Sequence, residues 1–479
     1  MNVVDLAALD GEHFDIIIVG SGFGSSFYLH RLLQNKPARR ILVLEWGKHF
    51  THDQQILANK NTDIPSRSTY TSASSKPWNF TIGFGGGTNC WFGQAPRFHP
   101  SDFELKSRYG MAADWPLTYG DLEESYLAAE QIMSISGDAA MAQVLPRSGA
   151  FPQPPHRMSA PDRLMKGAQP DRHFVMPTAR ARVATETRSS CCASFRCWLC
   201  PVDAKFTANN GLVDLFANEA VQIALNAKVD RFVAGADAVQ SAIVEVGGKE
   251  IRVSADRFVL GANAIHSPAI LLRSDMGGGL TGVGLHESYG SHVEAYLDGL
   301  DNFDGSTITT GLNYSLYDGE HRSQAGAALI YFDNRWTHGL RPERDRWRQT
   351  LPLMIVAEDL PENENTVSVD ASGAPVIAYK GPSDYAKRGQ QRAFDLLPEV
   401  LAPLPVEKIA FRSWRETESH LQGTLRMGND PQSSVIDAKM IHHRWRNLTV
   451  VGTSVFPTCS AANPSLTAAA LSLRAASLA

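Results

Sequence analysis

Long apolar runs, strong net charge and evenly spread cysteines are all missing from this 479-residue sequence. No stretch approaches 18 uninterrupted apolar residues, which excludes a membrane-spanning helix. The 45 basic and 50 acidic side chains nearly balance, and no long basic run occurs, so nothing favours nucleic acid or an anionic membrane as a partner. The start, MNVVDLAALDGEHF, lacks the basic segment, apolar run and cleavage site of an export signal. We therefore expect a cytoplasmic protein, unless a partner subunit carries it out.

Cysteine is scarce, and its placement is uneven. Four of the six cysteines fall between positions 191 and 200, at Cys191, Cys192, Cys197 and Cys200. Such crowding argues for a local metal or redox site rather than a disulfide framework spread over the fold. Thiolates at this spacing, the last followed by a proline, are typical of iron–sulfur ligation. A zinc or structural thiol knot and free or disulfide-bonded cysteines remain open as alternatives.

A strand, a glycine turn and a helix follow one another near the start of the chain. Asp15–Val19 is a short apolar, β-branched run of the kind buried on both faces of a sheet. The turn after it reads Gly20-Ser21-Gly22-Phe23-Gly24-Ser25. The first glycine permits the tight turn, and the second lets the backbone approach a pyrophosphate at the helix N-terminus. Ser25 stands where a third glycine is usual. The order of elements predicts a dinucleotide-binding site.

A second strand and a second glycine loop support that prediction. Ile41–Leu44 is apolar and ends in Glu45, 25 residues after Gly20. A carboxylate there can accept the ribose hydroxyls of an adenosine and would repel the 2′-phosphate of NADP. The loop Gly83–Trp91 holds three successive glycines, which let backbone N–H groups approach a phosphate or a ring edge. A flexible loop is the alternative, but the flanking aromatic residues speak against it.

Apolar patterns further along predict further strands and helices. Short runs between 221 and 262 predict a meander attached to the nucleotide domain, with separate strands at 250–253 and 257–262. Alternating segments between 300 and 415 predict an antiparallel sheet that carries a helix. Helices are expected over 211–220, 268–274 and 384–401. The predicted fold class is α/β: a Rossmann-like nucleotide-binding domain interleaved with an α+β substrate domain built on an antiparallel sheet.

Several motifs in a fixed order resemble one enzyme family, the glucose-methanol-choline (GMC) oxidoreductases. The N-terminal motifs are the glycine turn with Glu45 and the loop at 85–91. The later motifs are Asp114-Trp115-Pro116, Gly261-Ala262-Asn263-Ala264-Ile265-His266-Ser267-Pro268, His420-Leu421-Gln422-Gly423-Thr424 and Asn463-Pro464-Ser465-Leu466-Thr467. The resemblance runs from end to end and is weakest across 140–185 and 300–350. It implies non-covalent or covalent FAD and the oxidation of an alcohol to a carbonyl.

The resemblance places two catalytic side chains, His420 and Asn463, against the flavin. Removal of a hydride from an alcohol carbon requires the hydroxyl proton to leave as well, and a histidine can take it. A side-chain amide opposite can orient the carbon over flavin N5, which accepts the hydride. Taken alone, His420 resembles any surface or capping histidine and Asn463 a turn residue before proline. Their place in the family pattern favours catalysis.

The same comparison gives the expected cofactor-binding residues. These are Gly20, Gly22, Phe23, Gly24, Glu45, Gly86, Gly87, Asn89, Val229, Gly452, Thr453, Asn463, Pro464 and Ser465. Gly452 departs from the aspartate that many relatives carry. Cys90, next to Asn89, could form a thioether to the flavin, although a buried unmodified thiol fits better.

The cysteine segment resembles that of catalytic subunits in bacterial multi-subunit sugar dehydrogenases. These carry an iron–sulfur cluster beside FAD and pass electrons to a cytochrome. The last cysteine here is one residue closer, so both 3Fe-4S and 4Fe-4S clusters stay open. We expect a dehydrogenase for a sugar, polyol or small alcohol that delivers electrons to a protein or quinone acceptor, with an acceptor or small partner subunit. One alternative is an oxygen-dependent alcohol oxidase with structural cysteines. Another is an electron-transfer or assembly subunit without substrate chemistry, and the His420 and Asn463 pair speaks against it.

The expected domain organisation follows from the resemblance and the element pattern. Three segments form the FAD-binding domain, and two form the part that faces substrate. The FAD-binding segments are 1–110, 186–300 with the cysteines, and 416–479 with the catalytic pair. The lid or substrate segment is 111–185, and the substrate-binding domain is 301–415.

Overall fold

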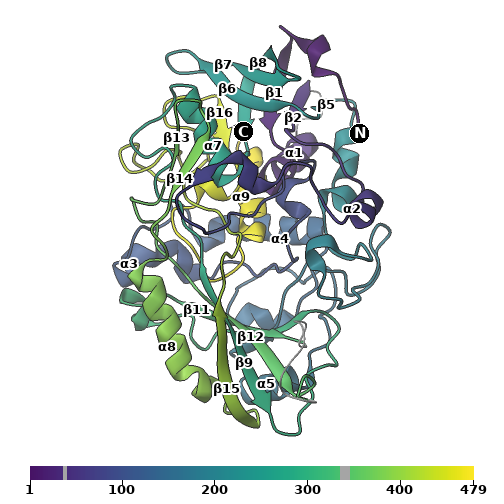
Figure 1. The fold of residues 1–479 in the computed structure, drawn as a ribbon, viewed down its shortest axis with the longest axis vertical. Coiled ribbons are helices and arrows are strands. Elements are labelled where there is room, and N and C mark those ends of the chain that lie inside the picture. Colours follow the sequence, from purple (N-terminus) through teal and green to yellow (C-terminus); the bar gives the residue numbers. More distant parts are fainter. Residues whose placement is uncertain (36–39, 335–345) are drawn as a thin grey trace.

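The computed structural model describes residues 1–35, 40–334 and 346–479. Two large sheets lie at opposite ends of the molecule (Figure 1). One is a seven-stranded mixed sheet, and the other is a six-stranded antiparallel sheet. The α/β fold class with both sheet types is as the sequence predicts. Among the described residues, no helix is both long and apolar enough to cross a bilayer.

The mixed sheet is built on the predicted strand and glycine turn. Its strand order is β5-β2-β1-β8-β7-β6, and β16 pairs with β8 at a branch. The strands are β1 (His13–Val19), β2 (Ile41–Leu44), β5 (Val221–Ala224), β6 (Lys228–Ala234), β7 (Val239–Val246), β8 (Lys249–Leu260) and β16 (Leu448–Val450). β1, β2, β5, β8 and β16 run parallel, and β6 and β7 form an antiparallel extension. Apolar side chains of β1 and β2 are fully buried, as expected for parallel strands covered on both faces.

Strand β8 corrects one expectation. The sequence pattern predicts separate strands at 250–253 and 257–262, but Lys249–Leu260 is continuous. Its first half pairs with β7, and from Ser254 onward it runs parallel to β1. The intervening residues Ala255 and Asp256 look like a break in the apolar run, yet they keep the extended backbone because β1 pairs alongside. Tertiary pairing decides the strand's length here, not local hydrophobicity.

The antiparallel sheet has the order β15-β9-β12-β11-β10-β4. Its strands are β4 (His173–Val175), β9 (Tyr289–Leu297), β10 (Thr309–Asn313), β11 (Ala328–Asp333), β12 (Thr350–Ala357) and β15 (Val406–Trp414). Helix α8 (Asp384–Val400) packs on β9, β11 and β12 (Figure 1). β4 and β9 come from outside 301–415, the range predicted for the substrate-binding domain. A third, small sheet joins β3 (Thr71–Ser72), β13 (Thr366–Val369) and β14 (Pro375–Ala378).

Alternation along the antiparallel strands separates a core face from a second face. Ile330, Phe332 and Ile355 are buried in a cluster that includes side chains of α8. Successive side chains of a strand point to opposite faces. Tyr331 and Asp333, one residue off this pattern, therefore lie on the face turned away from α8.

Helices connect the two sheets. Helix α1 (Phe23–Asn35) follows the glycine turn and packs against α9 (Ser465–Ser477), which also contacts α4 (Tyr119–Met133). The remaining α-helices are α2 (His52–Ala58), α3 (Leu105–Tyr109), α5 (Ala160–Ala168), α6 (Ala208–Gly211) and α7 (Asn263–Arg273). Figure 1 shows α9, in yellow, between the two sheets, so the C-terminal segment returns to the N-terminal turn.

Two helix predictions need correction. The helix expected over 211–220 is instead α6 followed by a 3₁₀ turn at Val213–Ala217. Leu212, with φ −135° and ψ 0°, leaves helical geometry between them. The helix expected from position 268 begins at Asn263, so Pro268 lies inside α7. The helix over 384–400 agrees with its apolar pattern.

Candidate active site

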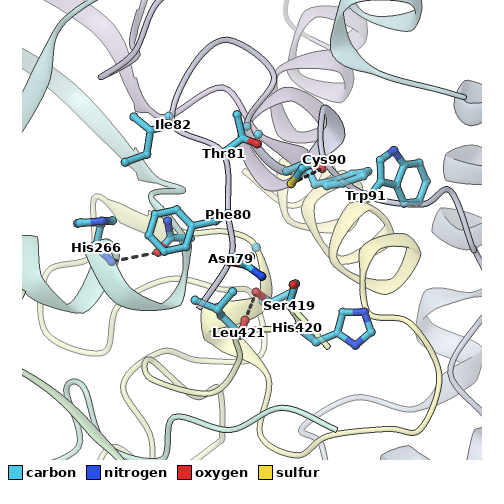
Figure 2. Close-up of a pocket in the computed structure, with 18 of the residues that line it drawn as sticks. Asn79, Phe80, Thr81, Ile82, Cys90, Trp91, His266, Ser419, His420 and Leu421 are labelled. Carbon is cyan, nitrogen blue, oxygen red and sulfur yellow. Dashed lines mark hydrogen bonds between the residues drawn. The ribbon is translucent and has the colours of Figure 1, made fainter. Parts of the chain in front are cut away.

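A cavity of about 1500 Å³ extends from the glycine turn to the antiparallel sheet. Ligand pockets commonly hold about 300–1,000 Å³. This cavity therefore has room for a dinucleotide and a small substrate together. Its wall combines the β1–α1 turn, the 79–94 loop, residues 194–198, strands β10 to β12 and the loop at 415–421. Figure 2 shows part of this wall, with Asn79–Ile82, Cys90 and Trp91 from the N-terminal loop and Ser419–Leu421 from the C-terminal loop.

The glycines of the turn have different structural roles. Gly20 has φ +84°, and a Cβ there would lie 2.7 Å from the Gly261 carbonyl oxygen. A Cβ at Gly24 would lie 2.7 Å from the Gly452 nitrogen. A Cβ at Gly22 would meet nothing within 3.8 Å. Two glycines thus permit tight backbone packing, while Gly22 leaves the turn open at the cavity wall.

Ser25 fits at the third glycine position because its neighbour is small. Its hydroxyl donates to the Val19 carbonyl at 3.1 Å. A Cβ at Gly261 would come within 2.2 Å of the Ser25 hydroxyl oxygen. The glycine missing from the turn is therefore compensated by a glycine at the end of β8.

Glu45 is buried at the cavity wall. One carboxylate oxygen accepts from the Ser21 N–H and hydroxyl at 3.1 and 2.7 Å, and the other accepts from the Gly47 N–H at 3.0 Å. Burial raises its pKa, and these donors oppose the rise. These bonds use three of the roughly four lone-pair sites of the carboxylate, so the oxygen bonded to Gly47 keeps capacity for the predicted ribose contact.

All but one of the predicted cofactor-binding residues line the cavity. The exception is Asn89, which is buried inside its loop. Its amide donates to the Phe84 carbonyl at 2.7 Å and accepts from Gln55 at 3.4 Å. Asn89 therefore shapes the glycine loop and does not reach the cavity. Cys90, the next residue, lines the cavity as a free thiol.

The predicted catalytic pair comes together at the cavity wall. Nε2 of His420 lies 3.4 Å from Nδ2 of Asn463, although 43 residues separate them in sequence. His420 is on the loop after β15, and Asn463 lies two residues before the start of α9. Burial, with smaller contributions from Arg415 and Lys76, lowers the pKa of His420 to about 3. The imidazole is therefore neutral at ordinary pH and can accept a proton.

Glu287 and Ser288 hydrogen-bond to the backbone and the ring of His420. The buried Glu287 carboxylate accepts from the backbone N–H groups of Glu418 and His420 at 3.1 and 3.0 Å. It is also paired with Lys76. The Ser288 hydroxyl lies 3.3 Å from Nδ1 of His420. One short segment before β9 thus fixes both the loop backbone and the ring.

Sequence reasoning missed the polar side chains around the pair. They are Gln94, Thr309, Tyr331, Asp333, Arg415 and Glu418, and all line the cavity. Burial raises the pKa of Asp333 to about 6 and that of Glu418 to about 7, and Arg415 opposes both shifts. Asp333 ends an apolar strand, and that polar terminus is the one signal in the sequence that points to the site.

The cysteine segment lies against the cavity, but its sulfurs are not arranged as a ligand set. Ser194, Phe195, Arg196 and Trp198 line the wall. Cys197 and Cys200 are buried, Cys191 is half-buried and Cys192 is exposed. Within residues 1–35, 40–334 and 346–479, no group of three or more His, Cys, Asp or Glu side chains is placed to hold a metal ion. The metal-binding role of the four cysteines therefore stays a prediction.

Comparison with known proteins places this geometry in a family. The chain is 25% identical to the fructose dehydrogenase large subunit of Gluconobacter japonicus, over 96% of this chain and 97% of that protein. It is 27% identical to paromamine 6'-oxidase of Streptomyces fradiae, over 98% and 91%. Among solved structures, pyridoxine 4-oxidase from Mesorbium loti superposes with a TM-score of 0.67 at 18% identity, over 97% of this chain and 98% of that one.

The family assignment itself comes from two matched regions. Residues 124–287 and 362–472, together more than half of the chain, match the family described as GMC oxidoreductase. The matched regions include the cysteine segment, α7 and the His420 and Asn463 loops. The chain belongs to the GMC oxidoreductase family, whose members are FAD-dependent enzymes that oxidise CH–OH groups.

Proposed function

We propose that this enzyme oxidises a hydroxyl group of a sugar, polyol or other small alcohol to a carbonyl. The neutral imidazole of His420 beside the Asn463 amide, on the wall of a dinucleotide-sized cavity, is the observation that carries the proposal. FAD, when bound, supplies the acceptor for the hydride that leaves the alcohol carbon. The chain's own residues bind, orient and deprotonate the alcohol.

The two catalytic side chains divide the work. Nε2 of His420 takes the hydroxyl proton, and the lowered pKa keeps the imidazole ring neutral before the reaction. The Asn463 amide contacts the substrate oxygen and so orients the carbon that loses the hydride. Glu287 and Ser288 keep the imidazole in place throughout.

The cavity fits a flavin dinucleotide at its other end. The open backbone at Gly22, the loop glycines Gly86 and Gly87, and the carboxylate of Glu45 would hold its phosphates and ribose. Val229 lies at the wall where the adenine is expected, and Gly452 and Thr453 lie beside the catalytic loops.

Polar side chains support a polyhydroxylated substrate. Asp333 and Gln94 keep acceptor and donor capacity beyond the bond that each makes to Thr309, on the wall formed with β10 and β11. Several hydroxyls of one sugar or polyol could be bound there at once. Relatives of this chain include a fructose dehydrogenase subunit and a 2-methyl-1,2-propanediol dehydrogenase.

The electron acceptor is the finer part of the proposal. The likeness to a dehydrogenase large subunit and the cysteine segment at the wall support transfer through an iron–sulfur cluster to a partner protein or a quinone. The second candidate is an oxygen-dependent alcohol oxidase. It is supported by two relatives named as oxidases and by the four cysteines, which form no group of three or more metal ligands among the described residues. We propose a cytoplasmic location for either form.

The test uses the purified full-length protein. We expect a yellow protein with one FAD per chain, whose colour bleaches anaerobically with a sugar or polyol and which forms a carbonyl product with an artificial acceptor. Iron and acid-labile sulfide analysis, with oxygen consumption, then separates dehydrogenase from oxidase. A protein that takes up no flavin, or whose flavin no alcohol in a broad panel bleaches, would contradict the proposal.

A further inference from the structure

A chain of four hydrogen-bonded side chains runs along the cavity wall to Asn463. The hydroxyl of Thr309 donates to the Asp333 carboxylate at 2.8 Å. The amide nitrogen of Gln94 donates to the Thr309 oxygen at 2.8 Å. The amide nitrogen of Asn463 donates to the Gln94 oxygen at 3.3 Å. The β10–β11 pairing sets the first link, because it places Thr309 opposite Asp333.

The direction of this chain is fixed at one end only. An ionised carboxylate can accept but cannot donate, so Asp333 forces the Thr309 proton toward itself. The Thr309 oxygen then needs a donor, which must be the NH₂ of Gln94. That choice turns the Gln94 oxygen toward Asn463 and requires the NH₂ of Asn463 to face it.

The other end tolerates either orientation of the Asn463 amide. The Tyr331 hydroxyl lies 3.2 Å from the Asn463 oxygen and 2.9 Å from the Ala461 carbonyl. If the amide turned over, Tyr331 could give its proton to Ala461 and accept from the Asn463 NH₂. Without the chain, nothing at this end would therefore hold the amide in one orientation.

The orientation of Asn463 matters because its second N–H faces the catalytic base. Nδ2 of Asn463 is 3.4 Å from Nε2 of His420. A donor at this position requires Nε2 to carry a lone pair, which leaves the proton on Nδ1, beside the Ser288 hydroxyl. A reversed amide would place an oxygen there and favour the tautomer with Nε2 protonated, which cannot take a proton from an alcohol.

We propose that Asp333, Thr309 and Gln94 form a positioning chain that locks the Asn463 amide with its NH₂ toward His420 and so presents Nε2 of His420 as an unprotonated base. This inference rests on the proposed function for its kinetic consequence but not for its geometry. A reversed chain would leave the Asp333 carboxylate without the Thr309 donor. Loss of such a bond disfavours the reversed orientation of the Asn463 amide by roughly 10- to 100-fold.

The decisive pair of variants is Thr309→Val and Thr309→Ser. Valine keeps the size of the side chain and removes the hydroxyl, whereas serine removes a methyl group and keeps the hydroxyl. Positioning predicts that Thr309→Val slows alcohol-driven flavin reduction by about 10- to 100-fold with a smaller change in KM, and that Thr309→Ser recovers most of the rate. Packing alone predicts the reverse order.

Two controls separate positioning from general damage. Thr350→Val removes a comparable buried hydroxyl, which donates to the Arg346 carbonyl at 2.7 Å in the same sheet, outside the cavity. It should leave the reduction rate unchanged. If Thr309→Val does not fold, Asp333→Asn replaces it, since asparagine keeps the shape and can donate to Thr309, which lets the chain reverse.

A second readout does not depend on activity. Protein labelled with ¹⁵N-histidine, with the His420 signal assigned by its loss in His420→Gln, reports which ring nitrogen carries the proton. We expect Nδ1–H in the wild type and a substantial Nε2–H population in Asp333→Asn. The same tautomer in both would overturn the positioning chain. The tautomer could also differ between wild type and Asp333→Asn while no alcohol reduces the flavin of the wild type. That result would support the positioning chain and contradict the proposed function.

Discussion

The two ends of the cavity are built in different ways. The nucleotide end is built around one contiguous segment, in which β1, the glycine turn and α1 follow each other within residues 13–35, and Glu45 and the loop glycines Gly86 and Gly87 add to it. The substrate end collects side chains from β10, β11, the loop after β15 and Asn463, two residues before α9. The first relies on backbone shape and the absence of side chains, and the second on the donors and acceptors of side chains. Variants at the two ends should therefore fail in different ways.

The largest effect should come from the base itself. His420→Ala removes the acceptor for the hydroxyl proton, so we expect anaerobic flavin reduction by alcohol to slow by about 10²- to 10⁴-fold. FAD content should stay at the wild-type level, because His420 is at the substrate end. The control is His13→Asn, an exposed histidine on β1. Equal reduction rates in His420→Ala and wild type would remove His420 from the chemistry.

At the nucleotide end, alanine at two nearby glycines should have different effects on the stability of the protein. Alanine is normally the better helix former by about 1 kcal/mol, but at Gly24 its Cβ would lie 2.7 Å from the Gly452 nitrogen. Gly24→Ala should therefore lower the free energy of unfolding by about 1–3 kcal/mol, as overpacking does, and deplete FAD.

Gly22→Ala meets nothing within 3.8 Å, so it should keep stability and lose FAD affinity alone. Gly278→Ala, with nothing within 4 Å, serves as the neutral control. Thermal unfolding of the apoprotein and FAD content measure the two effects separately. Equal unfolding temperatures for the Gly22 and Gly24 variants would contradict the distinction between packing and ligand-facing glycines.

A smaller effect on flavin reduction is expected from a change at Glu287, whose carboxylate accepts from the backbone of the His420 loop. Glu287→Gln keeps the shape but removes the charge beside Lys76 and weakens acceptance from the His420 N–H. We expect flavin reduction to slow about 10-fold, since charge-assisted hydrogen bonds contribute about 1.5–3 kcal/mol and part of this fixes the loop.

The double variant Lys76→Met/Glu287→Gln tests the cause. It removes both charges, so it should recover stability lost to the unpaired lysine. The reduction rate should not recover if loop position is what matters. Recovery of both together would show that Glu287 acts only by neutralising Lys76.

The smallest effect concerns pH. Burial raises the pKa of Asp333 to about 6, against the influence of Thr309, Arg415 and Arg180. Below pH 6 the protonated carboxyl can donate to Thr309 and allow the chain to reverse, so kcat should fall by up to about 10-fold as pH decreases. The pKa of His420, about 3, lies too low to account for this fall in kcat.

Two variants identify the group whose protonation lowers kcat below pH 6. Asp333→Asn cannot ionise, so its kcat should be low but flat between pH 5 and 7. Glu418→Gln removes the neighbouring carboxyl, whose pKa is about 7, and should leave the fall in kcat near pH 6 in place. A fall that persists in Asp333→Asn and disappears in Glu418→Gln would move the assignment to Glu418.

The same contrast explains how much the sequence could predict. Gly20, Gly22, Gly24 and Glu45 stand at spacings dictated by local geometry, and all line the cavity as expected. The predicted catalytic pair follows from the family pattern. Asn89 illustrates the limit, because a motif places a residue in a loop without fixing which way its side chain turns.

The positioning chain could not be predicted from local patterns. Thr309 and Asp333 meet because β10 and β11 pair in one register, and a slip of one residue would turn one of the two side chains to the other face of the sheet. Gln94 joins them across 215 residues of sequence. Such contacts exist only once the antiparallel sheet is assembled.

The most direct test of the whole account is a crystal structure of the protein loaded with FAD. We expect flavin density that extends from Glu45 along the glycine turn to the wall formed by His420 and Asn463. Density elsewhere, or a His420 ring remote from the flavin, would contradict it.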